Sequence, residues 1–96
     1  MNRLVLSATL VERAVLRYTP AGLPALDLSL QHESEVSEDG VPRKVSMEIK
    51  AVGIGAVTRS LLALELGAAG LYGGFITSTR NKRGLLFHIT SVDPVA

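Results

Sequence analysis

Alternating apolar and polar residues predict two half-buried β-strands in the middle of the chain. Over residues 25–32, every second residue from position 26 to position 30 is a leucine, and polar residues lie between them. Over residues 43–52, Val45, Met47 and Ile49 alternate with charged and polar residues in the same way. A two-residue period is typical of a strand that packs one face on a core. We therefore expect both segments to border the core.

The remaining residues of the first half predict a further strand, a turn and a loop. Segment 3–11 is rich in leucine and valine and predicts a first strand, which can continue past a bulge through residue 18. Prolines and a glycine in segment 19–24 predict a turn, so that residues 3–32 form a hairpin. Segment 33–42 is acidic and has turn residues, and it is expected to be a mobile loop.

The second half predicts a helix followed by a hairpin. Apolar residues at helical spacing predict a short helix over residues 56–65, ended by Gly67. Segments 71–79 and 85–92 predict two strands joined by the basic loop 80–84. We expect the aromatic residues of these strands to pack in the core and a pair of adjacent glycines to bend the first strand. The aromatic residues are Tyr72, Phe75 and Phe87, and the glycines are Gly73 and Gly74.

Three strands, a helix and two more strands, in that order, predict an all-β OB-fold. This fold is a five-stranded Greek-key barrel, here with a short helix between the third and fourth strands. We expect a single domain that covers residues 1–96. A small open α+β sandwich is the alternative architecture.

Composition favours a small binding protein over an enzyme. The chain has 96 residues, no cysteine and only two histidines, so it can form neither a disulfide nor a thiolate metal cluster. No serine lies in a nucleophile motif. We therefore predict a cytoplasmic protein with no catalytic residue, no metal, no cofactor and no membrane span. Because 47% of the residues are hydrophobic, we also expect an apolar subunit interface.

A net charge of +1 conceals an uneven distribution. Residues 1–40 contain three basic and six acidic residues, a balance of −3, whereas residues 41–96 contain seven basic and three acidic residues, a balance of +4. Three of the cations, Arg80, Lys82 and Arg83, lie in the basic loop. Such a concentration of positive charge indicates an anionic ligand.

Other candidate residues lie where an OB-fold binds nucleic acid, which is the outer face of its second and third strands and the loops 1–2 and 4–5. Arg17 and Tyr18 precede the first turn, and Arg43 and Lys44 begin the third strand. Tyr18 is the best candidate for stacking on a base. Because aromatic residues are scarce, binding of a single strand is expected to rest on phosphate contacts and to depend strongly on salt.

Several segments together resemble one family. Residues 2–10, 19–24 and 28–32, the Gly74-Phe75-Ile76 segment and the basic loop are similar to the primosomal replication protein N (PriB) family, a paralogue of bacterial single-stranded DNA-binding proteins. The resemblance implies an OB-fold homodimer that binds single-stranded DNA without sequence preference at stalled replication forks. It also implies that the protein bridges and stimulates the PriA helicase and, in some bacteria, contacts a further loading factor. The DNA contacts that it implies are Arg17, Arg43, Lys44, Arg80, Lys82 and Arg83.

Two positions depart from the pattern of this family. Ser46 occupies a DNA-contacting position at which some relatives have a stacking tryptophan, and Glu33 stands where some have a cation. Both departures imply weaker DNA binding. They leave room for an alternative function, a protein-interaction adaptor whose acidic segment docks a basic partner. The acidic residues of that segment are Glu33, Glu35, Glu38 and Asp39.

Overall fold

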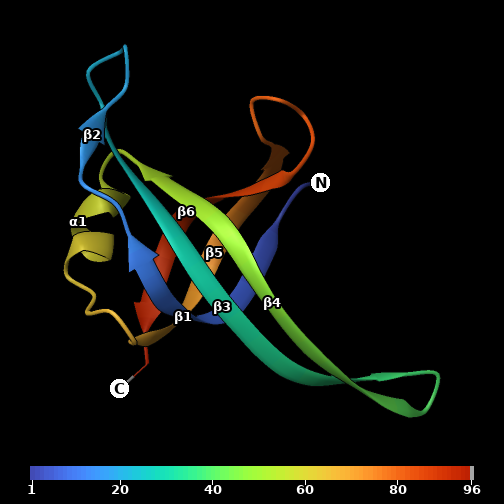
Figure 1. Cartoon of the computed structure of the whole chain (residues 1–96). Coiled ribbons are helices and arrows are strands. Elements are labelled where there is room, and N and C mark those ends of the chain that lie inside the picture. Colours follow the sequence, from blue (N-terminus) through green and yellow to red (C-terminus); the bar gives the residue numbers. More distant parts are fainter. Residues whose placement is uncertain (96) are drawn as a thin grey trace.

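The computed structural model describes residues 1–95, which form six strands and one helix. In chain order these are β1 (Leu4–Arg13), β2 (Arg17–Tyr18), β3 (Pro24–Glu38), β4 (Val41–Ile54), α1 (Val57–Leu62), β5 (Ala69–Ser78) and β6 (Leu85–Pro94). Figure 1 shows the long strands wrapped around one another, with α1 at one end and a two-stranded arm that extends away from the other strands.

The barrel closes because β1 pairs with two strands that lie far apart in the sheet. The order of hydrogen-bonded strands is β1-β5-β6-β4-β3-β2, and β1 also pairs with β3. The first half of β1 pairs with β5, and the second half, from Thr9 onward, pairs with β3 with a bulge between Leu10 and Glu12. All pairs are antiparallel except β4–β6. This closed barrel, with α1 between β4 and β5, confirms the predicted OB-fold rather than the open sandwich.

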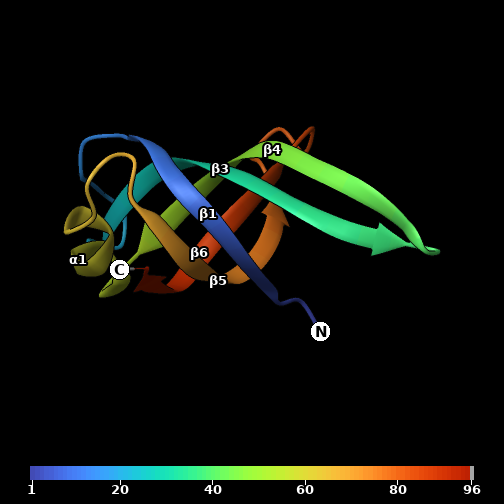
Figure 2. The same ribbon diagram turned by 90° about the horizontal axis from the view of Figure 1, so that it is seen from below.

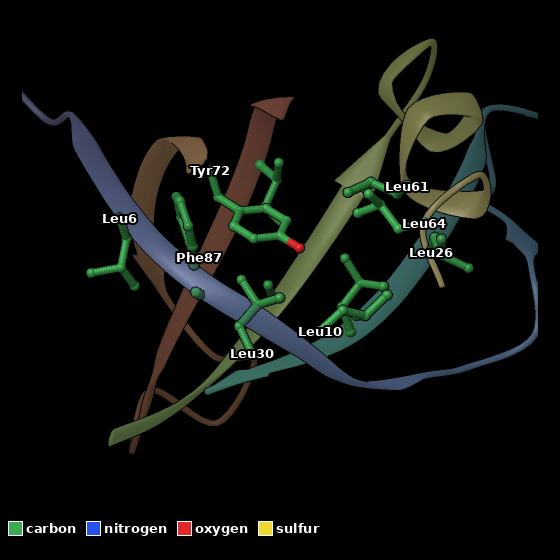
Figure 3. Packing of buried hydrophobic residues seen from close by; sticks show 12 residues of the cluster. Leu6, Leu10, Leu26, Leu30, Leu61, Leu64, Tyr72 and Phe87 are labelled. Atoms are coloured by element: carbon green, nitrogen blue, oxygen red, sulfur yellow. The ribbon is translucent and has the colours of Figure 1, made fainter. Parts of the chain in front are cut away.

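The core is built from the inward-facing side chains of the long strands. Leu10, Leu26 and Leu30 are completely buried, and so are Tyr72 on β5 and Phe87 on β6. Figure 3 shows these side chains together inside the barrel, next to Leu61 of α1. The core positions predicted for the two aromatic residues are thus confirmed.

Local features near the predicted ends of elements differ in detail from the sequence prediction. The helix is shorter than predicted and ends at Leu62, and Gly67, with φ of 89°, lies in the connection between α1 and β5. The bend predicted at Gly73 and Gly74 is present as a register shift between β5 and β6. A Cβ atom on Gly74 would lie 1.8 Å from the carbonyl oxygen of His88, so the two strands approach too closely for any other residue.

Segment 33–42 is a hairpin, so the prediction of a mobile loop was wrong. β3 continues to its end at Glu38, and β4 begins after a two-residue turn of Asp39 and Gly40. Both turn residues have positive φ, 49° and 76°, as a tight antiparallel hairpin requires. We call residues 33–46 the β3–β4 arm, because among the described strands β3 and β4 pair there only with each other. Figures 1 and 2 show the arm projecting beyond the barrel.

The arm has no buried face, which explains why segment 33–42 lacks an apolar period. Val45 and Met47, predicted to face the core with Ile49, lie on or beside the arm, and Met47 is exposed. Backbone pairing with the opposite strand holds the segment instead. At the base of the arm, the His32 Nδ1–H group donates to the carbonyl oxygen of Ser7 on β1 (2.5 Å). The arm is therefore tied to the barrel at one end only.

Replacing Tyr72 by phenylalanine is expected to stabilise the barrel. The Tyr72 side chain is fully buried, and its hydroxyl has no hydrogen-bond partner among residues 1–95. Because an unpaired buried hydroxyl costs about 1–3 kcal/mol, Tyr72→Phe should raise the free energy of unfolding by about 1 kcal/mol or more. Denaturant unfolding at neutral pH measures the difference. A less stable variant would show that the hydroxyl has a partner after all.

The same substitution should alter stability at alkaline pH. Burial raises the pKa of the Tyr72 phenol above its ordinary value. The unfolded chain therefore loses this proton at a lower pH than the folded chain, from about pH 10 upward. The stability linked to the neutral phenol is present below that pH and is lost as the pH rises. In Tyr72→Phe this part of the alkaline loss should be missing.

Candidate nucleic-acid interface

Hydrogen bonds at both ends give the basic loop a defined shape. The Thr79 N–H group donates to the carbonyl oxygen of Gly84 (2.9 Å), and the Gly84 N–H group donates to the Thr79 hydroxyl (3.2 Å). The side-chain oxygen of Asn81 accepts from the Thr79 hydroxyl (2.7 Å) and from the Arg83 N–H group (3.0 Å). The backbone of this loop is thus constrained by its own polar groups.

The three cations of the basic loop are exposed and have no acidic neighbour. Arg80, Lys82 and Arg83 all lie on the surface. Within residues 1–95, the cations that have a carboxylate within 4.0 Å are Arg17, Arg43 and Lys50. The basic loop therefore carries uncompensated positive charge, which is the property that attracts a phosphate chain.

Arg17 on β2 is held by an acidic residue of the neighbouring strand. Its Nε and Nη2 groups donate to the two carboxylate oxygens of Asp27, at 2.7 and 3.1 Å. Hydrogen bonding from the guanidinium lowers the pKa of Asp27 below its ordinary value, against a smaller opposing effect of partial burial. Both partners remain about half exposed. Tyr18, the next residue, is 67% exposed and is free to contact a ligand.

The candidate residues of the predicted third strand lie on the arm, on two different faces. Lys44 and Ser46 project from one face of β4, and Ser46 accepts a hydrogen bond from Gln31 on β3 (3.1 Å). Arg43 lies on the opposite face, as adjacent strand residues do, and its Nε is 3.3 Å from a carboxylate oxygen of Glu38. Sequence reasoning grouped Arg43 with Lys44 because it treated the pair as the start of a strand beside the barrel. The structure divides the two cations between the faces of the arm.

The fold brings some of these residues to one side of the molecule and not others. The turn after β2 and the basic loop both project from the upper side of Figure 1, at the left and the right. The arm, with Arg43 and Lys44 close to its turn, points to the lower right. The candidate contacts therefore lie in three separate places, on β2, on the basic loop and on the arm.

An aromatic pair on the surface was missed by the sequence analysis. Phe75 was predicted to pack in the core, but its side chain is 39% exposed and stacks on His88 of β6, with ring centroids 4.8 Å apart and planes within 12°. The error was detectable. Tyr72 and Phe75 are an odd number of residues apart in one strand, so they project from opposite faces.

A metal site and a membrane-spanning helix each place a requirement on the described residues. Residues 1–95 contain no group of three His, Asp or Glu side chains placed to hold a metal ion. The one helix of this part of the chain, α1, has six residues, far fewer than a span of the bilayer requires.

Comparisons with known proteins agree with this fold. Residues 2–91 match the model of a family described as another single-strand binding protein family. Replication restart protein PriB of Bordetella pertussis is 48% identical over 80 residues, which are 83% of this chain and 75% of that protein. The structure of PriB from Ralstonia solanacearum matches with a TM-score of 0.90 and 36% identity, over 100% of this chain and 99% of that one. Single-stranded DNA binding protein from Thermus aquaticus matches with a TM-score of 0.77 and 27% identity, over 100% of this chain and 50% of that one.

The barrel and the family model define a single-strand binding protein of the OB-fold class. Within this class, the two PriB proteins are identical to the chain at more than a third of the aligned positions, and each alignment covers most of both proteins. The chain belongs to the family of replication restart protein PriB.

Proposed function

We propose that this protein binds single-stranded DNA without sequence preference, as a non-enzymatic accessory of replication restart. The basic loop carries the proposal, since it holds three cations without acidic partners on an OB barrel of the PriB family. Phosphates have the same charge in every sequence, so contacts to them supply affinity without base preference. We expect Arg17, Tyr18, Lys44 and Ser46 to add contacts along the strand, and Arg43 to contribute from the other face of the arm.

Titration of a fluorescent oligo(dT) with the protein tests DNA binding. Fluorescence anisotropy at two salt concentrations gives the affinity and its salt dependence. Binding that weakens steeply with added salt supports contacts to phosphates. Failure to bind even at low salt would overturn the proposal.

We further propose that the protein bridges DNA and the PriA helicase and stimulates it at stalled forks, in the cytoplasm. A further primosomal loading factor is a second proposed partner. Membership of a family named for replication restart supports this role. Unwinding of a forked DNA by PriA, with and without the protein, tests it. Equal unwinding rates would contradict the stimulation.

We also propose that the protein is a homodimer. The outer face of β1 and β5, at the end of the two strands away from Phe75, exposes Val11 and Leu71, which are 45% and 42% accessible. A shallow hollow on this face is lined by Thr9, Val11 and Ala69, among others. Exposed apolar residues gathered on two adjacent strands favour an interface between copies. Sedimentation in dilute solution should give twice the mass of one chain, and a monomer would refute the proposal.

The adaptor alternative rests on the acidic arm, and its geometry weakens the case. Glu38 is paired with Arg43, and Glu35 lies directly across the strand pair from Lys44. Much of the acidic charge is therefore balanced within the arm. If the alternative were correct, charge reversal at Glu33 and Asp39 would abolish helicase stimulation and leave DNA affinity unchanged.

Replacing Asp27 by asparagine is expected to tighten DNA binding. The substitution removes the carboxylate that occupies the Arg17 guanidinium and so frees one cation for a phosphate. One additional contact contributes about 0.7 to the salt slope, which is about a fivefold gain at about 0.1 M salt. Anisotropy measures the gain. In the background of Arg17→Ala, Asp27→Asn should have a clearly smaller effect, and an equal effect there would show that Arg17 is not involved.

A further inference from the structure

We propose that Phe75 and His88 form a base-stacking platform on the outer surface of the barrel, for single-stranded DNA that the basic loop holds by its phosphates. The inference rests on the proposed DNA binding and adds to it the place where a base contacts an aromatic ring. Phe75 and His88 are direct cross-strand partners on β5 and β6. Their rings already stack on each other, with centroids 4.8 Å apart.

The pair lies on the outside of the barrel, in reach of a ligand. Its neighbours in the two strands, Ile76 and Phe87, are also paired with each other and pack toward the core. Alternation therefore places Phe75 and His88 outward. Stacking on His88 leaves 39% of Phe75 accessible. The accessible part is the surface on which a planar base can stack.

The surface beside Phe75 is open because a glycine precedes it on the same face. Gly73 lies two residues before Phe75, and its outward partner on β6 is Ser91. A Cβ atom on Gly73 would lie 2.7 Å from the Ser91 hydroxyl, so a side chain there would require Ser91 to move. Because the residue is glycine, no side chain projects from this position of β5, and a base can approach the ring from there.

A cation of the neighbouring strand lies beside the platform. Leu4 pairs with Gly74, so the next residue pair of β1 and β5 places Arg3 opposite Phe75. The backbone N–H group of Ile76 donates to the Asn2 side-chain oxygen (3.0 Å), which keeps the start of the chain beside β5. A phosphate next to a stacked base would thus meet Arg3.

The basic loop continues the same surface. After Phe75, the next outward residue of β5 is Thr77, and the strand then ends and the loop begins. On β6, Leu86 lies two residues before His88 and close to the other end of the loop. Only a few amino-acid residues separate the basic loop from the aromatic pair, so a strand of DNA that contacts the loop can also reach the pair. This arrangement combines phosphate contacts with stacking, as in proteins that bind single strands without sequence preference.

Affinity for oligo(dT) and for an abasic oligomer of equal length tests the platform, because the two ligands share phosphates and differ in bases. The original protein should bind oligo(dT) more tightly than the abasic oligomer. Phe75→Leu should lose about tenfold in affinity for oligo(dT) and little for the abasic oligomer, since only stacking is removed. Phe75→Tyr keeps the ring and should retain most of the affinity. Equal losses for both ligands, or no loss, would overturn the platform.

A tryptophan at position 75 gives a second, direct readout. The chain has no tryptophan, so the fluorescence of Phe75→Trp comes from this site alone. Stacking of a base should quench it as oligo(dT) is added, whereas Leu66→Trp, in the exposed connection before β5, should not respond. Anisotropy of the labelled oligonucleotide is followed in the same samples. Binding without quenching at position 75 refutes the platform and leaves the proposed DNA binding intact, whereas no binding by the original protein refutes both.

Discussion

Replacing Arg80, Lys82 and Arg83 together by alanine is expected to weaken binding of single-stranded DNA about 100-fold at about 0.1 M salt. These side chains are exposed and have no acidic partner among the described residues, so nothing in the fold competes with a phosphate for them. Each phosphate contact on a single strand contributes about 0.7 to the slope of log K against log salt. Removing all three cations should therefore reduce that slope by about two.

Anisotropy titrations at several salt concentrations measure both effects at once. The fold should survive, because the hydrogen bonds that shape the basic loop come from Thr79, Asn81 and backbone groups and not from the three cations. Arg59→Ala is a matched control, since it removes an exposed cation from α1. That variant should change the affinity only slightly. An unchanged slope in the triple variant would remove the basic loop from the interface.

Replacing Gly74 by alanine is expected to lower the free energy of unfolding by about 3 kcal/mol or more. A Cβ atom at this position would lie 1.8 Å from the carbonyl oxygen of His88, a backbone atom that cannot move without disturbing β6. The β5–β6 pair would have to separate at the point where the barrel is bent. Because β5 also pairs with β1, the shift would be felt on both sides of the strand.

Thermal and denaturant unfolding measure this loss, which corresponds to a fall in Tm of about 12 °C or more for a domain of this size. Gly84→Ala is the matched control. A Cβ atom there would lie 3.5 Å from the nearest atom of Thr79, an ordinary contact, so this variant should remain within about 1 kcal/mol of the original. If the two variants were equally stable, the close approach at Gly74 would not be a constraint on the fold.

Sequence reasoning succeeded where one strand face is buried. The leucines of β3 and the aromatic residues Tyr72 and Phe87 follow the two-residue period, and all are in the core. It failed for segment 33–42 because the arm leaves the barrel and buries neither face, so no apolar period records that it is a strand. The Asp39-Gly40 turn was the available signal, since this dipeptide favours two-residue hairpins.

The sequence predicted which residues belong to the candidate site better than it predicted where they lie. The basic loop was recognisable because three cations in four residues need no tertiary information. Arg43 and Lys44 were grouped by proximity in sequence, although neighbours in a strand face opposite ways. Phe75 was placed in the core because aromatic residues usually are buried, and its exposure next to His88 depends on how β5 pairs with β6.

The sequence by itself determined the order of the main elements, the buried leucine face of β3 and the location of the main positive charge. These are local properties that follow from the period of apolar residues, the residues of the turns and the composition. Only the tertiary structure decided how the barrel closes through β1, how far the arm extends, and which cations are already neutralised by a carboxylate across a strand pair. The reason is physical: register and strand order join residues far apart in the chain, and no local pattern records which of them become neighbours.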